Sequence, residues 1–373
     1  MKILVVCDGL FRGGLAKVVL AWIGGLSARG HVVGLALLNP QKDYPLPPLA
    51  WQAEFPERAP KGGLLRWRHR ARWTAFIRES ITRFEHQHGE ADLVIAAGEE
   101  CLRCAAWVEH RNLWISSHSS QLQSPKGEGA WARLRYRIKI WRRGMRLRAL
   151  LDGRNMHMIS EGQARELTEV LGVLPRRMKV IANPFDIESI RAQAAQSTPQ
   201  SLAQSRPFII GIGEFNTRKA FERLVDAFAC CKFEGDLVLV GQGEARKALE
   251  RQANTLGIAR RVKFVPFHDN HYALLARAKL LVMTSKSEGL PNTLVEALVV
   301  GVPAIALDCP HGPKEILGPV CADALISQDR LDFLPARIDH FVATPYAIDE
   351  AAVARFRQDH VLRQIECLAG SLD

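Results

Sequence analysis

The sequence predicts an α/β protein of two doubly wound domains, each a parallel sheet covered by helices. Short apolar, β-branched segments alternate with helix-length periodic segments along the whole chain, which is typical of repeated βα units. The 373 residues are too many for one ordinary core and suit two domains. A polar stretch without aromatic side chains, at 191–206, separates the two sets of segments and is typical of a linker.

Each half of the chain is expected to contribute five strands. The first strand, at 3–7, is an apolar run that ends in a polar-Gly turn and is too short for the core of a signal peptide. The other strands of the first half are expected at 32–38, 93–97, 114–117 and 156–159. Those of the second half are expected at 208–213, 237–240, 262–265, 280–283 and 304–307.

These strands predict a first domain over 1–190, the linker at 191–206 and a second domain over 207–348. Apolar residues near helical spacing in the last segment, 349–373, predict a helix that packs back toward the first domain. Ligands of open α/β sheets bind beyond the carboxyl ends of the strands, which predicts a site in a cleft between the two domains.

The net charge of +11 comes entirely from the first half of the chain. Residues 1–190 contain 29 Lys and Arg against 18 Asp and Glu, whereas residues 191–373 contain 21 of each. This asymmetry predicts that the first domain meets an anionic partner, which is nucleic acid, a lipid surface or a phosphorylated substrate. A merely solvated basic face is the alternative that the charge alone leaves open.

A basic segment at 131–148 interleaves cations with aromatic and aliphatic side chains. On a helical wheel, a rough apolar stripe is formed by Leu134, Ile138, Trp141, Met145 and Leu147. Basic residues beside such a stripe are typical of a helix that lies on anionic lipid. The residues expected to face an acceptor or a membrane are Arg133, Arg137, Trp141, Arg142 and Arg143.

The cysteines favour a reducing compartment and no metal site. Eight cysteines are scattered without a disulfide framework. Cys101 and Cys104 have the spacing of metal ligands, but no second pair follows, so we expect structural thiols and no bound metal. No stretch reaches the roughly 18 uncharged residues of a membrane-spanning helix.

The most informative stretch runs from Ser285 to Ala297. A strand ends before it, a Gly-Pro turn follows, and a helix is expected to start near 291–293. Free backbone amides at a helix start form a ready site for a diphosphate. Glu288 and Glu296 lie eight residues apart around this start, and by spacing alone they are either chemical groups or capping and surface charges.

Glu288 to Glu296 resembles the E-x7-E signature of retaining glycosyltransferases of the GT-B fold, and its surroundings resemble the GT4 family. Four further motifs stand in family order, at 10–19, 180–186, 240–244 and 312–317. They resemble, in turn, the Gly-Gly loop near the nucleotide, the interdomain Asn-Pro-x-Asp turn, the G-x-G turn and the loop beyond the donor. The resemblance spans nearly the whole chain and implies a GT-B fold of two Rossmann-like doubly wound domains facing each other across a cleft.

The resemblance also implies roles for residues at matching positions. Glu288 is expected to face the hydroxyls of the donor sugar, and Glu296 the ribose of the nucleotide. Lys219, with Arg218 beside it, is expected to neutralise the leaving diphosphate without a metal or another cofactor. The other positions expected at the nucleotide sugar are Gly13, Gly14, Gly241, Gly243, Gly289, Leu290 and Asn292.

His118 follows an apolar strand and matches the active-site His of the family. The resemblance implies that it orients the donor or stabilises an oxocarbenium-like transition state, because the donor phosphate can take the acceptor proton. One departure is Glu214, which stands where relatives commonly place an Arg. Either Arg218 takes over that contact with the diphosphate, or Glu214 turns away.

The resemblance thus implies a retaining glycosyltransferase that moves a hexose or N-acetylhexosamine from a nucleotide sugar, expected to be UDP-linked. The loop at 309–315 is most similar to enzymes of lipopolysaccharide core, O-antigen or capsule assembly, whose acceptors are lipid-anchored and often phosphorylated. We therefore expect a cytoplasmic protein, peripheral on the cytoplasmic face of the inner membrane. A same-fold nucleotide-sugar phosphorylase or epimerase is one alternative. The other is a nucleic-acid-binding protein, for which no helix-turn-helix, zinc-finger or RNP signature is found, so nucleic acid is not expected as a partner.

Overall fold

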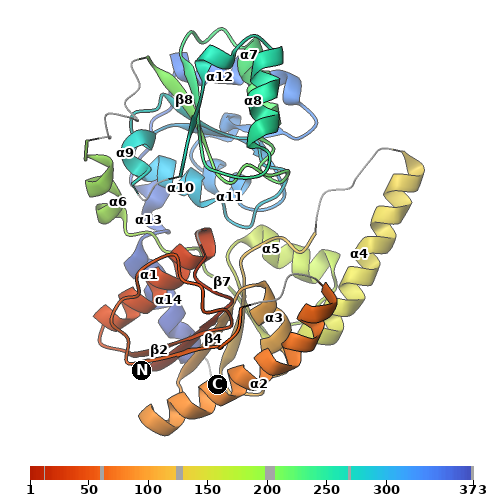
Figure 1. Ribbon diagram of the computed structural model, residues 1–373, viewed down its shortest axis with the longest axis vertical. Helices are drawn as coiled ribbons and strands as arrows, with labels where there is room; N and C mark the ends of the chain where they lie inside the picture. The colour runs from red at the N-terminus through yellow and green to blue at the C-terminus, as the bar shows by residue number, and fades with distance from the viewer. Residues whose placement is uncertain (12, 59–62, 123–128, 198–205, 268–269, 371–373) are drawn as a thin grey trace. The chain divides into compact units, whose positions relative to one another are not determined.

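The chain forms two compact units in the computed structural model (Figure 1). Unit 1 comprises Met1–Phe185 and Phe356–Asp373, and unit 2 comprises Asp186–Arg355. The structure describes residues 1–11, 13–58, 63–122, 129–197, 206–267 and 270–370.

Unit 1 is built on a seven-stranded, wholly parallel sheet in the order β3-β2-β1-β4-β5-β6-β7. Its strands are β1 (Lys2–Cys7), β2 (Val32–Leu37), β3 (Trp51–Glu54), β4 (Leu93–Ala97), β5 (Leu113–Ser117), β6 (Asn155–Met158) and β7 (Arg177–Val180). Its helices are α1 (Gly14–Ala28), α2 (Gly63–His88), α3 (Glu99–Ala105), α4 (Ala130–Leu151), α5 (Glu161–Arg165), a π-helix (Glu166–Val170) and α14 (Gln358–Ala369).

Helices cover both faces of this sheet, which explains why residues 3–7 of β1 are all apolar. Leu4 and Val6 join the core shared with α2, α3 and α4, whereas Ile3, Val5 and Cys7 join the core shared with α1 and α14. Successive side chains of a strand point to opposite faces, so both sets must be apolar when both faces are covered.

The C-terminal helix α14 completes unit 1 by packing on α1. Val361 and Ile365 are fully buried in the core that α1 shares. At the helix ends, Glu366 accepts hydrogen bonds from Arg29 Nε at 2.7 Å and lies 2.7 Å from His31 Nε2. A segment far away in sequence is therefore part of this domain.

Unit 2 contains a six-stranded parallel sheet in the order β10-β9-β8-β11-β12-β13. Its strands are β8 (Phe208–Ile212), β9 (Asp236–Val240), β10 (Val262–Val265), β11 (Leu280–Met283), β12 (Ala304–Asp308) and β13 (Leu325–Ser327). Its α-helices are α6 (Ile187–Ala194), α7 (Phe221–Cys230), α8 (Arg246–Thr255), α9 (Tyr272–Leu275), α10 (Asn292–Val299), α11 (Pro313–Leu317), α12 (Leu334–Ala343) and α13 (Ala351–Ala354). Short 3₁₀ turns lie at Ala259–Arg261, Ala322–Ala324 and Leu331–Phe333.

The structure confirms the predicted pair of parallel doubly wound sheets, and all ten predicted strands occur with ends within one residue. Three strands that the sequence did not suggest are β3, β7 and β13, and each lies at a sheet edge. The units change over at 185/186, before the predicted linker at 191–206, and at 355/356, within the predicted last segment at 349–373. Residues 198–205 of the predicted linker lie outside the described residues.

Candidate functional site

A buried carboxylate joined to two cations is the main chemical feature of unit 2. Glu288, whose side chain is 7% exposed, contacts Lys219 Nζ through Oε1 and Arg218 Nη1 through Oε2, each at 2.7 Å. The cations follow β8 and the carboxylate follows β11, two neighbouring strands. Because adjacent parallel strands end at the same sheet edge, the fold brings together three of the predicted residues.

The loop that carries the two cations is held by Asn216. Its Oδ1 accepts hydrogen bonds from the backbone N–H groups of Arg218, at 3.1 Å, and Lys219, at 3.0 Å. Ala220 follows with φ of 50°, in the left-handed region where a side chain is strained. The Thr284 hydroxyl donates to the Ala220 carbonyl at 3.0 Å and ties this strained residue to the end of β11. These contacts fix the backbone that presents both cations.

Glu214 turns toward its own loop. Its side chain accepts a hydrogen bond from Asn216 Nδ2 at 2.8 Å, and the residue is exposed. The carboxylate therefore supports the residue that holds the cation loop. Arg218 contacts Glu288, and its takeover of a diphosphate contact stays a prediction.

The two cations keep Glu288 ionised. Burial alone raises the pKa of this carboxyl, but the charges of Lys219 and Arg218 outweigh it, and the pKa lies below its usual range. Nearby, burial together with the charge of Glu288 raises the pKa of the Cys309 thiol to about 12. The cation pair thus already binds one buried anion, and a phosphate group has the same charge-assisted hydrogen-bonding demand.

The second glutamate of the motif has different partners. Helix α10 starts at Asn292, within the predicted range, and places Glu296 about one turn inside, where it is 3% exposed. Glu296 Oε2 lies 3.0 Å from His271 Nε2, and its Oε1 accepts a hydrogen bond from the Tyr272 hydroxyl at 3.4 Å. The predicted contact of Glu296 with a ribose stays a prediction.

The other predicted positions of unit 2 lie in turns that pack tightly. A Cβ on Gly241 would collide with the carbonyl oxygen of Gly213, and one on Gly243 with that of Phe215. Packing between the turns after β8 and β9 therefore requires both glycines, whatever their role toward a nucleotide. Just before α10, the turn residues Gly289 and Leu290 are buried and Asn292 is half-buried.

In unit 1, the predicted Gly-Gly loop forms the start of α1. Gly13, which has no side chain to cap the helix, is the N-cap residue, and the helix begins at Gly14. This start follows β1, where the strand order of the sheet changes direction between β1 and β4. Such a switch point with a helix start is where open α/β sheets bind phosphate groups. The contact of Gly13 and Gly14 with a diphosphate stays a prediction.

His118 follows β5, is half-buried, and is hydrogen-bonded to the buried polar groups behind it. Its Nε2 lies 2.8 Å from Ser116 Oγ, which lies 2.8 Å from His157 Nδ1, and His157 Nε2 lies 2.9 Å from the carbonyl oxygen of Ile181. The Trp22 ring packs against both imidazoles. Burial, with His157 nearby, lowers the pKa of His118 to about 3, and burial lowers the pKa of His157 to about 4. Both rings are therefore neutral at neutral pH.

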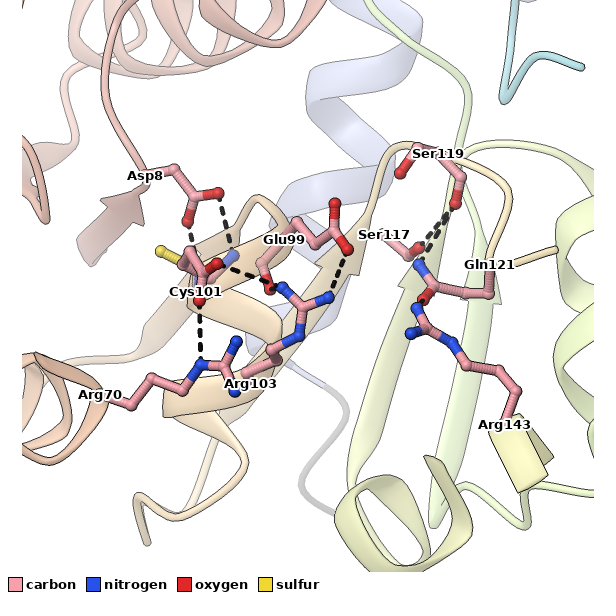
Figure 2. Close-up of polar contacts among 10 residues, drawn as sticks. Asp8, Arg70, Glu99, Cys101, Arg103, Ser117, Ser119, Gln121 and Arg143 are labelled. Carbon is pink, nitrogen blue, oxygen red and sulfur yellow. Dashed lines mark hydrogen bonds and ion pairs between the residues drawn. The ribbon is translucent and has the colours of Figure 1, made fainter. Parts of the chain in front are cut away.

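A carboxylate at the end of β1 caps α3. Asp8, at the end of β1, accepts hydrogen bonds from the backbone N–H groups of Glu100 and Cys101 at 3.0 and 2.7 Å (Figure 2). Burial raises the pKa of Asp8, and these two hydrogen bonds oppose that rise. Cys101 and Cys104 are buried in the adjoining core as free thiols.

Helix α4 carries the predicted cationic surface. Its large apolar residues at positions 131, 134, 138, 141 and 145 are exposed by 46% or more and follow a 3-4-3-4 spacing, so they form one stripe. Leu147 is 5% exposed on the opposite side, because each residue turns the helix by about 100°, so its inclusion in the stripe is wrong. Arg133, Arg137 and Arg142 are exposed.

Arg143 differs from the other cations of α4. It is half-buried and donates to Gln121 Oε1 at 2.5 Å (Figure 2). Burial, with Arg103 nearby, lowers its pKa. Arg143 therefore packs against its own domain. Within the described part of the chain, no helix has the length and apolar character needed to cross a membrane.

The fold, the cation pair at Glu288 and the hydrogen-bonded histidines at His118 together define a GT-B protein with a candidate phosphate site in its second domain. Comparison with family models matches residues 12–189 to Glycosyltransferase Family 4 and residues 193–350 to Glycosyl transferases group 1. The chain belongs to this family of glycosyltransferases, and the comparison confirms the GT-B fold predicted from the sequence motifs.

Curated relatives resemble part of this chain. The lipopolysaccharide 1,6-galactosyltransferase of Salmonella typhimurium is 24% identical over 190 residues, which cover 50% of each chain. The lipopolysaccharide core biosynthesis glycosyltransferase LpsE of Rhizobium meliloti is 35% identical over 35% of this chain and 38% of its own. The N-acetylgalactosamine-N,N'-diacetylbacillosaminyl-diphospho-undecaprenol 4-alpha-N-acetylgalactosaminyltransferase of Campylobacter jejuni is 25% identical over 43% of this chain and 42% of its own. The chain thus spans half or less of the length of these relatives.

Solved structures resemble the whole chain in fold. Anabaena Alr3699/HepE, in complex with UDP-glucose, superposes with a TM-score of 0.70 at 19% identity and covers 100% of both chains. The lipopolysaccharide outer core galactosyltransferase WaaB superposes with a TM-score of 0.69 at 18% identity, over 100% of this chain and 99% of the other.

Several partners of the predicted residues were not suggested by the sequence. Ser116 and His157 lie 41 residues apart, and only the pairing of β5 with β6 brings them together. His271 reaches Glu296 across 25 residues. Asn216 alone had a usable signal, because Asn before a short polar run favours a turn in which its side chain bonds the backbone.

Proposed function

We propose that the protein is a retaining glycosyltransferase that moves a hexose or an N-acetylhexosamine from a UDP-sugar to a lipid-anchored, phosphorylated surface glycan such as lipopolysaccharide core. The observation that carries the proposal is the buried Glu288 carboxylate held at 2.7 Å by both Lys219 and Arg218. Two fixed cations at one point suit the charge that a departing nucleoside diphosphate develops. HepE, which is described in complex with UDP and with UDP-glucose, supports the choice of donor.

In the proposed reaction, the bond between the sugar C1 and the diphosphate oxygen breaks. A bond between C1 and an acceptor hydroxyl oxygen forms on the same face of the sugar, and the acceptor proton passes to the departing diphosphate. Lys219 and Arg218 neutralise the diphosphate, while ionised Glu288 accepts hydrogen bonds from sugar hydroxyls. Neutral His118 orients the donor sugar or stabilises the positive charge at C1 through its lone pair. The proposed step uses no metal and no other cofactor.

The acceptor is proposed from the relatives and from the charge of unit 1. The Campylobacter jejuni relative is named for an undecaprenol-linked diphosphate sugar, and the Salmonella typhimurium relative for lipopolysaccharide. Residues 1–190, most of which form unit 1, account for the whole net positive charge of the chain, and a phosphorylated, lipid-held glycan offers the complementary charge.

The exposed stripe of α4 is proposed to rest on an anionic membrane, on the cytoplasmic face of the inner membrane. Trp131 and Trp141 are 77% and 60% exposed, and Arg137 and Arg142 flank the stripe on opposite sides of the helix. An apolar stripe between two rows of cations matches the acyl and headgroup layers of an anionic bilayer, which is the one partner we propose for this face.

The activity is tested by incubating the purified protein with UDP-glucose, UDP-galactose and their N-acetyl derivatives, with and without lipid-linked lipopolysaccharide core. We expect UDP release that rises with acceptor and a product with the anomeric configuration of the donor. Turnover of the donor with inorganic phosphate, or interconversion of two donors without acceptor, would show a phosphorylase or an epimerase. No turnover, together with retention on nucleic acid in moderate salt, would show the nucleic-acid-binding alternative.

The role of His118 is tested by its replacement with alanine. We expect a lower kcat for the His118→Ala variant, because removing a contact made only in the transition state lowers kcat. An unchanged kcat with a raised KM would restrict His118 to ground-state binding.

Membrane binding is tested with vesicles of phosphatidylglycerol and phosphatidylethanolamine against vesicles of phosphatidylcholine. We expect binding to the anionic vesicles alone, and about a fivefold loss on Arg142→Gln. Trp141→Ser is expected to weaken binding, whereas Trp107→Ser, equally exposed at 60% but away from α4, is the matched control. Equal binding to both vesicles, or equal effects of the two Trp variants, would contradict this proposal.

A further inference from the structure

The series of hydrogen bonds from His118 through Ser116 and His157 ends at a backbone carbonyl, and this end fixes the position of the first proton. The carbonyl oxygen of Ile181 can only accept a hydrogen bond, so His157 must carry its proton on Nε2, 2.9 Å away. His157 is 0% exposed and, with its pKa lowered to about 4 by burial, holds no second proton at neutral pH. Its Nδ1 is therefore an acceptor.

The direction of the remaining hydrogen bonds follows from this end. Ser116 has a single hydroxyl proton, and it must donate that proton to His157 Nδ1 at 2.8 Å. The hydroxyl then offers only lone pairs to His118 Nε2, also at 2.8 Å. If Nε2 were unprotonated, its lone pair would face a lone pair of the Ser116 oxygen, and the two atoms would form no hydrogen bond despite their short distance. Nε2 of His118 must therefore carry the proton.

The other nitrogen of His118 is left as an acceptor. No hydrogen bond to Nδ1 is recorded among the described residues, and the residue as a whole is partly exposed. Trp22 packs against both rings, with ring centroids 5.5 Å from His118 and 5.6 Å from His157. The plane of the His118 ring is thus held by packing against Trp22 and by the hydrogen bond between Nε2 and Ser116.

We propose that Ser116 and His157 are positioning residues, which hold His118 in one ring orientation and as the Nε2–H tautomer, so that Nδ1 accepts a hydrogen bond from a hydroxyl group of a bound sugar. A ring fixed in this way presents a lone pair to a hydroxyl donor and rejects a carbonyl or ether oxygen at the same point. The tautomer is a property of the protein alone, whereas its use in turnover rests on the proposed function.

The tautomer is tested by NMR on the full chain with ¹⁵N-labelled histidine. We expect long-range ¹H–¹⁵N spectra at pH 7.5 to show His118 and His157 both with protonated Nε2 and unprotonated Nδ1, each as a single form. Assignment uses His118→Gln and His157→Gln. A His118 spectrum with protonated Nδ1, or with two averaged forms, would overturn the proposal whether or not the protein transfers sugar.

The positioning role is tested by matched serine variants. We expect Ser116→Ala to lower kcat roughly 10- to 100-fold, in line with the loss of a partner that orients a functional histidine, and to speed solvent exchange of the His118 Nε2 proton. Ser116→Thr keeps the hydroxyl and is expected to restore most of kcat. Ser117→Ala is the control, because Ser117 is buried at the next position of β5, on the other face, and its hydroxyl donates only to the Ser119 carbonyl among the described residues.

The outcomes separate the two proposals. If no sugar donor is turned over but Ser116→Ala changes the His118 tautomer or its proton exchange, the proposed function fails and the positioning holds. If the wild type is active and Ser116→Ala keeps full kcat at unchanged thermal stability, Ser116 does not position His118 for turnover. An unfolded Ser116→Ala leaves Ser116→Thr and the wild-type spectrum to decide.

Discussion

The site around Glu288 and the site around His118 hold their central side chains by different kinds of interaction. In unit 2, Glu288 is ionised and held by two cations, whereas in unit 1 His118 is neutral and held by a chain of hydrogen bonds that ends on a backbone carbonyl. Ionic partners can exchange one anion for another with little loss, because each exchange conserves charge. The hydrogen bonds behind His118 join neutral groups and end on a backbone carbonyl, so no group in them can be replaced by a ligand in this way. The proposed exchange of Glu288 for a diphosphate therefore suits the ionic contacts of unit 2, whereas the hydrogen bonds of unit 1 keep one lone pair of His118 in place.

Removing Lys219 tests the ionic side most severely. We expect Lys219→Ala to lower kcat/KM for sugar transfer roughly 100- to 1000-fold, since one fixed donor to a developing anion is lost. Lys263→Ala, which removes a half-buried lysine of β10 whose ammonium donates to the Arg260 carbonyl, is the matched control. Steady-state release of UDP measures both, and a Lys219→Ala enzyme with near-normal kcat would show that the cation pair serves only structure.

Arg218 is expected to matter less, because its side chain is 46% exposed and water screens its charge. We expect Arg218→Ala to lower kcat/KM about tenfold, and Glu214→Arg to leave it within about twofold. The same UDP assay compares the two. A fully active Arg218→Ala would refute the takeover of the diphosphate contact by Arg218.

Glu288→Gln separates binding from turnover. The neutral amide no longer competes for Lys219 and Arg218, so we expect tighter UDP binding, by about fivefold, or roughly 1 kcal/mol. Turnover is expected to fall in the same variant, because the ionised acceptor for sugar hydroxyls is gone. Calorimetry with UDP measures the affinity. Weaker UDP binding would contradict the competition between Glu288 and a diphosphate.

Acid tests the neutral histidines of unit 1 through protein stability rather than through turnover. The ordinary histidine pKa is 6.5, and burial lowers that of His157 to about 4, so below pH 6.5 the unfolded chain binds the extra proton and stability falls. This loss is present at pH 5 as about 2 kcal/mol and is fully developed once the pH passes about 4. We expect His157→Gln to make the fall in urea-unfolding free energy from pH 7 to pH 5 shallower. His86→Gln, an exposed histidine of the same unit, should leave that fall unchanged.

The strands show how much of the fold can be predicted from the sequence. All central strands were predicted because residues with both faces covered must be apolar throughout. The three missed strands, β3, β7 and β13, are short edge strands with half-exposed residues, so their composition resembles that of a loop. Pairing with a neighbour, rather than local composition, makes them strands.

The unit boundary shows the same limit. The polar segment at 191–206 looks like a linker, yet α6 runs into this segment as far as residue 194 and packs within unit 2 through Ile187 and Ile190. Likewise, helical spacing over 349–373 does not reveal that α13 belongs to unit 2 and α14 to unit 1. Composition reports solvent exposure, whereas domain membership depends on which core a segment covers.

For α4, the sequence alone identified the cations and most of the stripe, and the structure assigned Leu147 and Arg143 to the inner side. The wheel was ambiguous because apolar residues lie on both sides of this helix, one side packing on the core and the other exposed.

The sequence alone is enough to predict the two parallel sheets, the E-x7-E pair with its neighbouring cations and the basic character of the first domain. These are local patterns of polarity, spacing and charge. The tertiary structure decided that Glu288 takes both cations, that Glu214 turns to Asn216, and that Ser116 and His157 stand behind His118. Such choices depend on which strand ends lie side by side, and therefore on pairing between residues that no local pattern connects.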